Sequence, residues 1–192
     1  MTQKRTLKGR STKGSDTHRK VISSELHNAT AEITLAEQDI LQSLELLHQH
    51  AANLLGGSTV IGRPISHDPL SAHLMLEAGI PNRAIDHLAG TLSVMGQNSL
   101  EQAIGMSLRT LQRKEKNPLQ LLSHEQAGRA WQFAELLAKA TAVFGTQTEA
   151  ERWFESPAIG LNQKRPIDLL TTPAGVKIVE DHLERLAYGV YA

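Results

Sequence analysis

The chain has 192 residues, of which 40% are hydrophobic and 4% aromatic, and its formal net charge is zero. This length allows one domain or two small ones, and abundant Ala and Leu with few β-branched runs predict an all-α fold. Cysteine is absent, which excludes disulfides and thiolate chemistry. Since no apolar run reaches the ~20 residues of a membrane helix, we expect a cytoplasmic protein with no membrane contact.

Residues 1–30 form a basic tail that we expect to be disordered, because its charge and its Gly, Ser and Thr content prevent burial of a core. Asp16 is the one acidic residue among the first 20, and the basic residues there are Lys4, Arg5, Lys8, Arg10, Lys13, Arg19 and Lys20. The tail is either a solubilising extension, or the product of a misassigned start codon, or an arm that adds salt-sensitive contacts to phosphates. The sequence leaves these alternatives open.

Residues 31–67 are predicted to be an extension helix followed by a linker. Helical spacing places Ile40, Leu44, Leu47, Ala51 and Leu54 on one apolar stripe. Gly56 and Gly57 should end this helix, and turn formers dominate residues 56–67. The stripe needs a partner, either the main body or the same helix in a second subunit. His48 and His50 point to different sides of the helix, so we expect no metal site there.

Capping residues divide residues 68–192 into a series of short helices. The expected helix starts are Asp68-Pro69, Pro81, Ser99, Ser107, Ser123, Thr148, Pro166 and Thr172-Pro173. The glycines expected to end helices are Gly79, Gly105, Gly145 and Gly189. Three starts have the spacing of a capping box, namely Ser99 with Gln102, Ser123 with Gln126, and Thr148 with Glu151.

Residues 99–113 have the pattern of a helix-turn-helix, in which two short helices are joined by a turn that contains Gly105. Apolar residues should pack the pair onto neighbouring helices, which leaves a basic, polar face on the second helix for phosphates and base edges. The candidate DNA-binding residues are Ser107, Arg109, Thr110, Gln112, Arg113 and Lys114. The alternative is a solvated basic helix in an ordinary bundle, and Glu101 stands where such motifs usually have a small residue.

Residues 141–192 are predicted to form two capped helices, joined by a proline-bounded connection and followed by an apolar end. The last five residues, from Tyr188 to Ala192, include two tyrosines and a valine. Chain ends are normally polar, and tyrosine suits an interface because it combines a large area with a polar tip. We therefore expect this end to dock on this chain or on another.

Several ordered motifs of this segment resemble the toxin-binding domain of the Xre/MbcA/ParS family of antitoxins, from bacterial type II toxin–antitoxin pairs. They are Val143-Phe-Gly145, Ala150-Glu-Arg-Trp-Phe154 with Pro157, Leu161 with Lys164-Arg-Pro-Ile-Asp-Leu-Leu170, Thr172-Pro-Ala-Gly175, and Val179-Glu with Leu186-Ala-Tyr-Gly-Val-Tyr191. Upstream, Arg109-Thr-Leu-Gln-Arg113 followed by Leu122-Ser123 is similar to the Xre-type DNA-binding half of that family. The resemblance spans residues 68–192 and leaves residues 1–67 as an extension of unknown purpose.

The resemblance implies an antitoxin that acts as a homodimer. Its partner would be a RES-fold toxin that consumes NAD, and its helix-turn-helix would bind operator DNA and repress the shared operon. It implies a DNA-binding domain over residues 68–140 and a toxin-binding domain over residues 141–192, whose end lies near the toxin's active site. The candidate toxin-binding residues are Trp153, Arg165, Pro166, Leu169, Tyr188, Val190 and Tyr191. For Trp153 and Leu169, as for Phe154, the alternative is a place in the core of the small domain.

Two other classes of protein share some of these sequence features. A stand-alone helix-turn-helix regulator with a C-terminal dimerisation domain would share every feature except the docking tail. An enzyme is disfavoured, because no phosphate-binding loop or Ser/His/Asp arrangement is present. Glu149, Glu151 and Glu155 are explained by the preference for acidic residues near a helix start. We therefore expect no catalysis and no cofactor in this chain.

Overall fold

The computed structural model describes residues 37–38, 40–64, 69–107, 109–110 and 120–189. The chain divides into two units, Met1–Ser43 and Leu44–Ala192. In the first unit the described residues 37, 38 and 40–43 are helical. The predicted basic tail, Asp68, Leu108, Gln112, Arg113, Lys114, Val190 and Tyr191 all lie outside the described residues.

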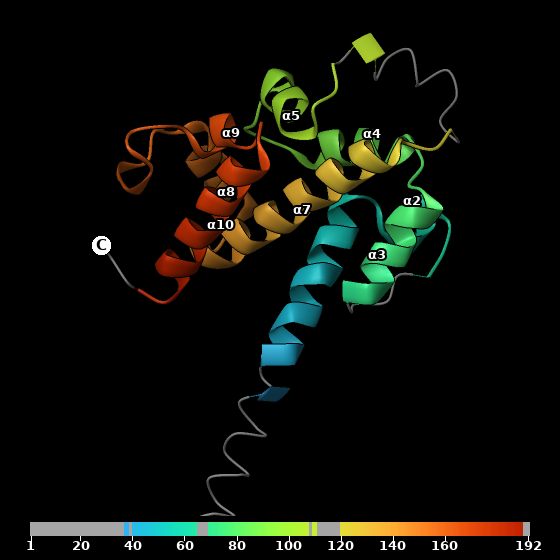
Figure 1. The fold of residues 1–192 in the computed structure, drawn as a ribbon, viewed down its shortest axis with the longest axis horizontal. Helices are drawn as coiled ribbons and strands as arrows, with labels where there is room; N and C mark the ends of the chain where they lie inside the picture. Colours follow the sequence, from blue (N-terminus) through green and yellow to red (C-terminus); the bar gives the residue numbers. More distant parts are fainter. Residues whose placement is uncertain (1–36, 39, 65–68, 108, 111–119, 190–192) are drawn as a thin grey trace, which may run out of the picture. The chain divides into compact units, whose positions relative to one another are not determined.

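The second unit is all-α across its described residues, as predicted, and begins with helical residues 44–54 (Figure 1). The helices that follow are α2 (Gly57–Ile61), α3 (Pro69–Ala78), α4 (Arg83–Thr91), α5 (Gln97–Ile104), α7 (His124–Phe144), α8 (Gln147–Glu155), the 3-10 turn η1 (Ile159–Leu161), α9 (Pro166–Leu169) and α10 (Pro173–Ala187). None of the helices in the described parts of the chain is long and apolar enough to cross a bilayer.

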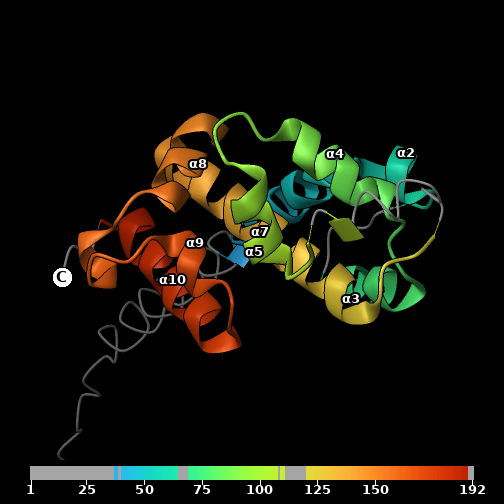
Figure 2. The same ribbon diagram turned by 90° about the horizontal axis from the view of Figure 1, so that it is seen from above.

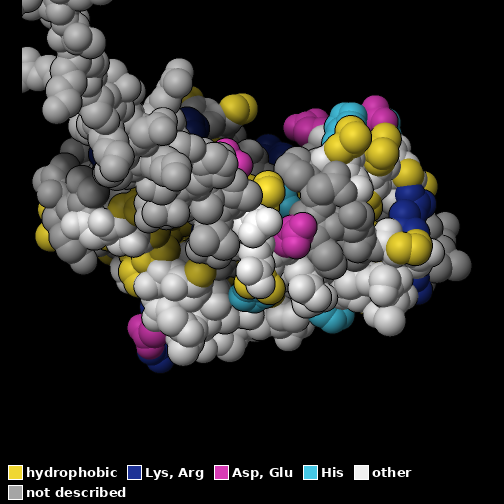
Figure 3. All heavy atoms as spheres, turned by 90° about the horizontal axis from the view of Figure 1, so that it is seen from below, with side chains coloured by type: hydrophobic (Ala, Val, Ile, Leu, Met, Phe, Trp, Pro, Cys, Tyr) yellow, Lys and Arg dark blue, Asp and Glu magenta, His cyan; other side chains and the backbone are white. Residues whose placement is uncertain are grey.

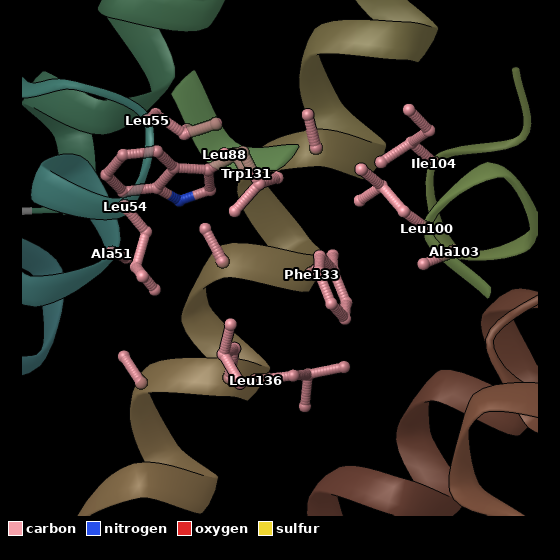
Figure 4. Packing of buried hydrophobic residues seen from close by; sticks show 14 of the residues in the cluster. Ala51, Leu54, Leu55, Leu88, Leu100, Ala103, Ile104, Trp131, Phe133 and Leu136 are labelled. Atoms are coloured by element: carbon pink, nitrogen blue, oxygen red, sulfur yellow. The ribbon is translucent and has the colours of Figure 1, made fainter. Parts of the chain in front are cut away.

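Helix α7 is the centre of this unit and packs against α3, α5, α8 and α10 (Figures 1 and 2). Small side chains on α7 allow neighbouring helices to approach closely, and its larger ones fill the spaces between them. Trp131 lies beside Leu54 and Leu55, whereas Phe133 points toward α5 (Figure 4). Helix α7 also runs without interruption through residues 140 and 141, where the sequence predicted a division between two domains.

The apolar stripe of the first helix packs on the main body along part of its length. Ala51 and Leu54 are buried, and Leu47 is half-buried, but the side chain of Leu44 is 42% exposed. The helix ends at residue 54, before Gly56 with its left-handed φ of 91°. The prediction of a plain linker over residues 56–67 was wrong in part, because residues 57–61 form α2.

Most helix ends follow the predicted capping chemistry. Ser123 and Gln126 form the complete capping box of α7, and Gly145 ends that helix with a left-handed φ of 84°. Pro166 occupies the first turn of α9. The hydroxyl of Thr172 accepts a hydrogen bond from the amide of Gly175 at the start of α10.

Two predicted N-caps were wrong, by three residues at α5 and by two at α8, and both errors have a local cause. Helix α5 starts at Gln97 after Gly96, so Ser99 lies buried inside the first turn and its amide donates to the carbonyl of Gly96. Helix α8 starts at Gln147 because the hydroxyl of Thr146 accepts the amide of Glu149. In each case a residue earlier in the chain is the N-cap, so the helix begins before the predicted start.

Candidate functional surfaces

The helix-turn-helix region has the predicted turn. Gly105 ends α5 with a left-handed φ of 65°, which glycine adopts without steric cost. The amides of Gly105 and Met106 both donate to the carbonyl of Glu101. The hydroxyl of Ser107 then accepts the amide of Thr110 at 3.3 Å and lies 3.0 Å from the Thr110 hydroxyl. Ser107 therefore caps the next helical segment, as the sequence predicts.

The turn is held against α7 by Arg129. A Cβ atom at position 105 would displace the flexible Arg129 guanidinium, and the left-handed φ is the stronger reason for glycine there. The guanidinium also donates to the carbonyl of Gln102 at 3.4 Å. A cation at the carboxyl end of α5 interacts favourably with the helix dipole. The close contact between this motif and α7 is thus at Gly105 and not at position 101. The half-exposed side chain of Glu101 therefore has room.

Of the six candidate DNA-binding residues, Ser107, Arg109 and Thr110 lie in the described part of the chain. Ser107 and Arg109 are exposed, and Thr110 is half-exposed. Arg109 is thus an exposed cation two residues after the cap residue Ser107.

Glu151 is an anchoring residue that sequence reasoning missed, because it was explained by the preference for acidic residues near a helix start. Its side chain is 0% exposed. One carboxylate oxygen, Oε2, accepts the amides of Ser93, Val94 and Met95 at 2.9, 2.6 and 2.9 Å. Three consecutive amides that converge on one oxygen form a backbone anion nest. Glu151 of α8 therefore fixes the loop that leads into α5.

Gln147, one turn before Glu151, completes this anchor. Its side-chain amide donates both to the second carboxylate oxygen of Glu151 and to the carbonyl of Thr91, each at 2.8 Å. The end of α4 and the start of the following loop are thus both held by α8. No pattern within residues 147–151 identifies these partners, because they lie more than 50 residues away in the chain.

A second link to the helix-turn-helix runs through Asp168 of α9, which is held in place by Arg165, the N-cap residue of α9. The Arg165 guanidinium donates to both carboxylate oxygens of Asp168 at 2.9 and 2.7 Å, and to Glu155 at 3.2 Å. Asp168 also accepts the side-chain amide of Gln102 on α5 at 3.3 Å. The hydrogen bond from Arg165 holds the pKa of Asp168 below its ordinary value. The same pair raises the pKa of Arg165.

These residues border an open hollow of about 660 Å³ between the start of α5 and the C-terminal helices. Its lining residues are Val94, Gly96, Gln97, Asn98, Ser99, Gln102, Glu155 and Arg165. Glu155 accepts a hydrogen bond from Arg165 in this lining, whereas Glu151, one turn earlier on α8, is fully buried and accepts the loop amides.

The candidate toxin-binding residues occupy three kinds of environment. Pro166 is buried, whereas Trp153, Arg165 and Leu169 are half-buried. Tyr188 is 83% exposed and caps the carboxyl end of α10. Phe154, weighed as a core residue, is fully buried and packs edge-on against Phe133 with ring centroids 5.8 Å apart.

Helices α9 and α10 meet at a close backbone contact. A Cβ atom at Gly175 would overlap the carbonyl oxygen of Leu169. Glycine is therefore required where α10 turns back against α9. This contact and the Thr172 cap fix the direction of α10, and with it the position of Tyr188.

The fold and these surfaces define an all-α protein in which a helix-turn-helix is braced by a small C-terminal helical module. Residues 71–135 match the family model of the antitoxin Xre-like helix-turn-helix domain. Residues 139–189 match that of the antitoxin Xre/MbcA/ParS C-terminal toxin-binding domain. The chain therefore carries the two domains of an Xre-type antitoxin, over residues 71–135 and 139–189.

A curated relative agrees with this assignment. The chain is 34% identical over 82 residues to a protein named Antitoxin Xre from Pseudomonas putida (strain KT2440). The match covers 43% of this chain and 51% of the relative, so it spans about half of the relative's length.

Proposed function

We propose that this chain is the antitoxin of a type II toxin–antitoxin pair. It binds and neutralises a RES-type, NAD-consuming toxin through residues 141–192, and as a homodimer it represses its own operon through the helix-turn-helix. Both activities belong in the cytoplasm. The observation that carries the proposal is the C-terminal module itself, which matches a toxin-binding domain and ends in a tyrosine that is 83% exposed. The chain's part is binding only, and NAD chemistry belongs to the toxin.

Toxin binding is tested with the product of the open reading frame adjacent to this chain's gene. A catalytically inactive form of that product is co-expressed with the full chain and with a chain that lacks residues 188–192. We expect co-purification and growth rescue with the full chain, and loss of both with the truncated chain, because Tyr188, Val190 and Tyr191 supply apolar contact area. Full neutralisation by the truncated chain would contradict the role of the tail.

Operator binding is tested by a mobility-shift assay with the promoter region of the operon. Arg109→Ala combined with Arg113→Ala should weaken binding about 100-fold, since each groove contact contributes roughly 1–3 kcal/mol. Arg152→Ala is the matched control, because Arg152 is an exposed arginine of α8 that pairs with Glu149 on its own helix. Unchanged affinity in the double variant would place the DNA contact elsewhere.

The homodimer is tested in the same assay. Two helix-turn-helix units of a dimer bind half-sites about one helical turn of DNA apart, so operators with altered half-site spacing should lose affinity. A chain that binds this operator but captures no toxin would instead be the stand-alone regulator that the sequence left as an alternative.

A further inference from the structure

A row of aromatic rings lies across the C-terminal module, at the carboxyl end of α7. Phe144 of α7 and Trp153 of α8 have ring centroids 5.3 Å apart, and Trp153 stacks on His182 of α10 with centroids 6.1 Å apart and planes 8° from parallel. All three side chains are half-exposed. The row thus joins three helices and reaches the surface.

Aliphatic side chains extend this row outward. Ile178, one turn before His182 on α10, is 48% exposed, and Ile159 of η1 is 85% exposed. Between them Gly160 lies so close to His182 that a Cβ atom there would overlap the imidazole ring. Ile178 and His182, four residues apart, therefore lie on one face of α10, and η1, which carries Ile159, packs against this helix. Figure 3, seen from below, shows hydrophobic side chains at the surface on the left, the side on which α10 lies in Figure 1.

The opposite flank of α10 has a different character. Lys139 of α7 pairs there with Glu180 and Glu184 of α10. Charged side chains thus cover the seam between α10 and α7, while the seam between α10 and η1 is aromatic and aliphatic. Burial, followed by the charge of Arg185, lowers the pKa of His182, which favours the neutral ring. The exposed Arg185, three residues after His182, borders this flank, and the aromatic and aliphatic groups beside it suit an apolar partner surface.

We propose that the surface formed by Ile159, Gly160, Ile178 and His182, backed by Trp153, is a second contact site for the toxin, separate from the tail. This rests on the proposed function. The occupant is a toxin because the whole surface lies within residues 139–189, the segment that matches a toxin-binding domain. It is carried by the same helix as the start of the tail, since His182 lies on α10 and Tyr188 is the C-cap of that helix. The aromatic row is the rigid anchor, and the two isoleucines widen it.

The test measures the affinity of the full chain for the purified, catalytically inactive product of the adjacent reading frame by biolayer interferometry. Ile159→Asp with Ile178→Asp should weaken binding at least 10-fold without changing the thermal unfolding midpoint, because both side chains are exposed. His182→Ala should also weaken binding, whereas His182→Phe, which keeps a neutral ring against Trp153, should largely retain it. Leu70→Asp with Leu74→Asp is the matched control, since both leucines are exposed on α3, outside the toxin-binding match.

The outcomes separate this surface from the proposed function. If the unaltered chain does not bind the probe, the proposed function is wrong and the surface fails with it. If the unaltered chain binds and the isoleucine double variant binds equally well, only the surface is overturned. If that variant instead dissociates the chain's own dimer while its toxin affinity is unchanged, the surface contacts a second copy and the proposal is wrong.

Discussion

Replacing Glu151 by alanine removes the acceptor of three backbone amides and one side-chain amide. In the folded protein the amide of Met95 is buried, so it would have no ready replacement for the carboxylate. The amides of Ser93 and Val94 are part-buried and can partly turn to water. The loop before α5 should therefore loosen first, and global stability should fall with it.

The expected loss of unfolding free energy follows from the burial of the three amides, one of which is buried and two of which are part-buried. A buried donor without an acceptor costs about 1–3 kcal/mol, and each hydrogen bond that water can replace contributes about 0.5–1.5 kcal/mol. We therefore expect Glu151→Ala to lower the free energy of unfolding by about 4 kcal/mol. For a chain of this size that corresponds to a fall in Tm of roughly 8–16 °C. Glu151→Gln keeps one acceptor oxygen and should lose about half as much.

The assay is urea unfolding followed by circular dichroism, combined with amide hydrogen exchange. Exchange at Val94 and Met95 should accelerate in the variant more than exchange within the centre of α7. Glu149→Ala is the control, because Glu149 lies on the same helix but pairs with Arg152 at the surface, where such pairs contribute about 0–1 kcal/mol. If Glu151→Ala unfolded within about 0.5 kcal/mol of the natural chain, the three amides would not depend on the carboxylate and the reasoning would be refuted.

Three further predictions concern the same framework. Gly175→Ala should lower the free energy of unfolding by about 1–3 kcal/mol in urea titrations, because the added Cβ overlaps the Leu169 carbonyl oxygen; an unchanged midpoint would show that α9 can move away at no cost. Ser123→Ala should cost about 1 kcal/mol in the same assay by removing the cap of α7, and Ser123→Asp should restore most of it. Since Arg165 lowers the pKa of Asp168 in the folded state, their pair stabilises the fold above the unfolded pKa of about 3.9, and this contribution is lost as pH falls through the lower folded pKa. Below about pH 4 the free energy of unfolding should therefore fall less steeply with pH in Asp168→Asn than in the natural chain. The same pH dependence in both would contradict the assigned role of the Asp168–Arg165 pair.

The features that the sequence predicted well depend on interactions within four residues of chain. The capping box of Ser123 and Gln126, the cap of Thr172 and the glycine at the end of α7 are of this kind. The two wrong starts carried the same local pattern. Ser99 and Thr148 each have a suitable residue three positions later, but Gly96 and Thr146 begin their helices earlier. The sequence pattern alone cannot decide which of two nearby residues is the N-cap, because that depends on the backbone geometry.

The anchoring role of Glu151 could not be predicted for a different reason. Glutamate is rarely buried, and its partners at residues 93–95 come close only when α8 packs beside the loop after α4. The exposed flank of α10 could not be predicted for the same reason. The pattern of α10 alone gives its buried stripe, but only packing shows that Gly160 lies against His182 and that Ile159 is left exposed.

These long-range contacts show that the helix-turn-helix is not held in place by its own residues alone. Glu151 and Gln147 of α8 fix the backbone between α4 and α5, and Asp168 of α9 accepts a hydrogen bond from Gln102 in α5. All of these anchoring side chains lie within the segment that matches the toxin-binding domain. The buried side chains also form one continuous core from Ala51 to Leu183, with α7 running through it. The two matched domains therefore share one folded body, in which the C-terminal helices position the first helix of the helix-turn-helix.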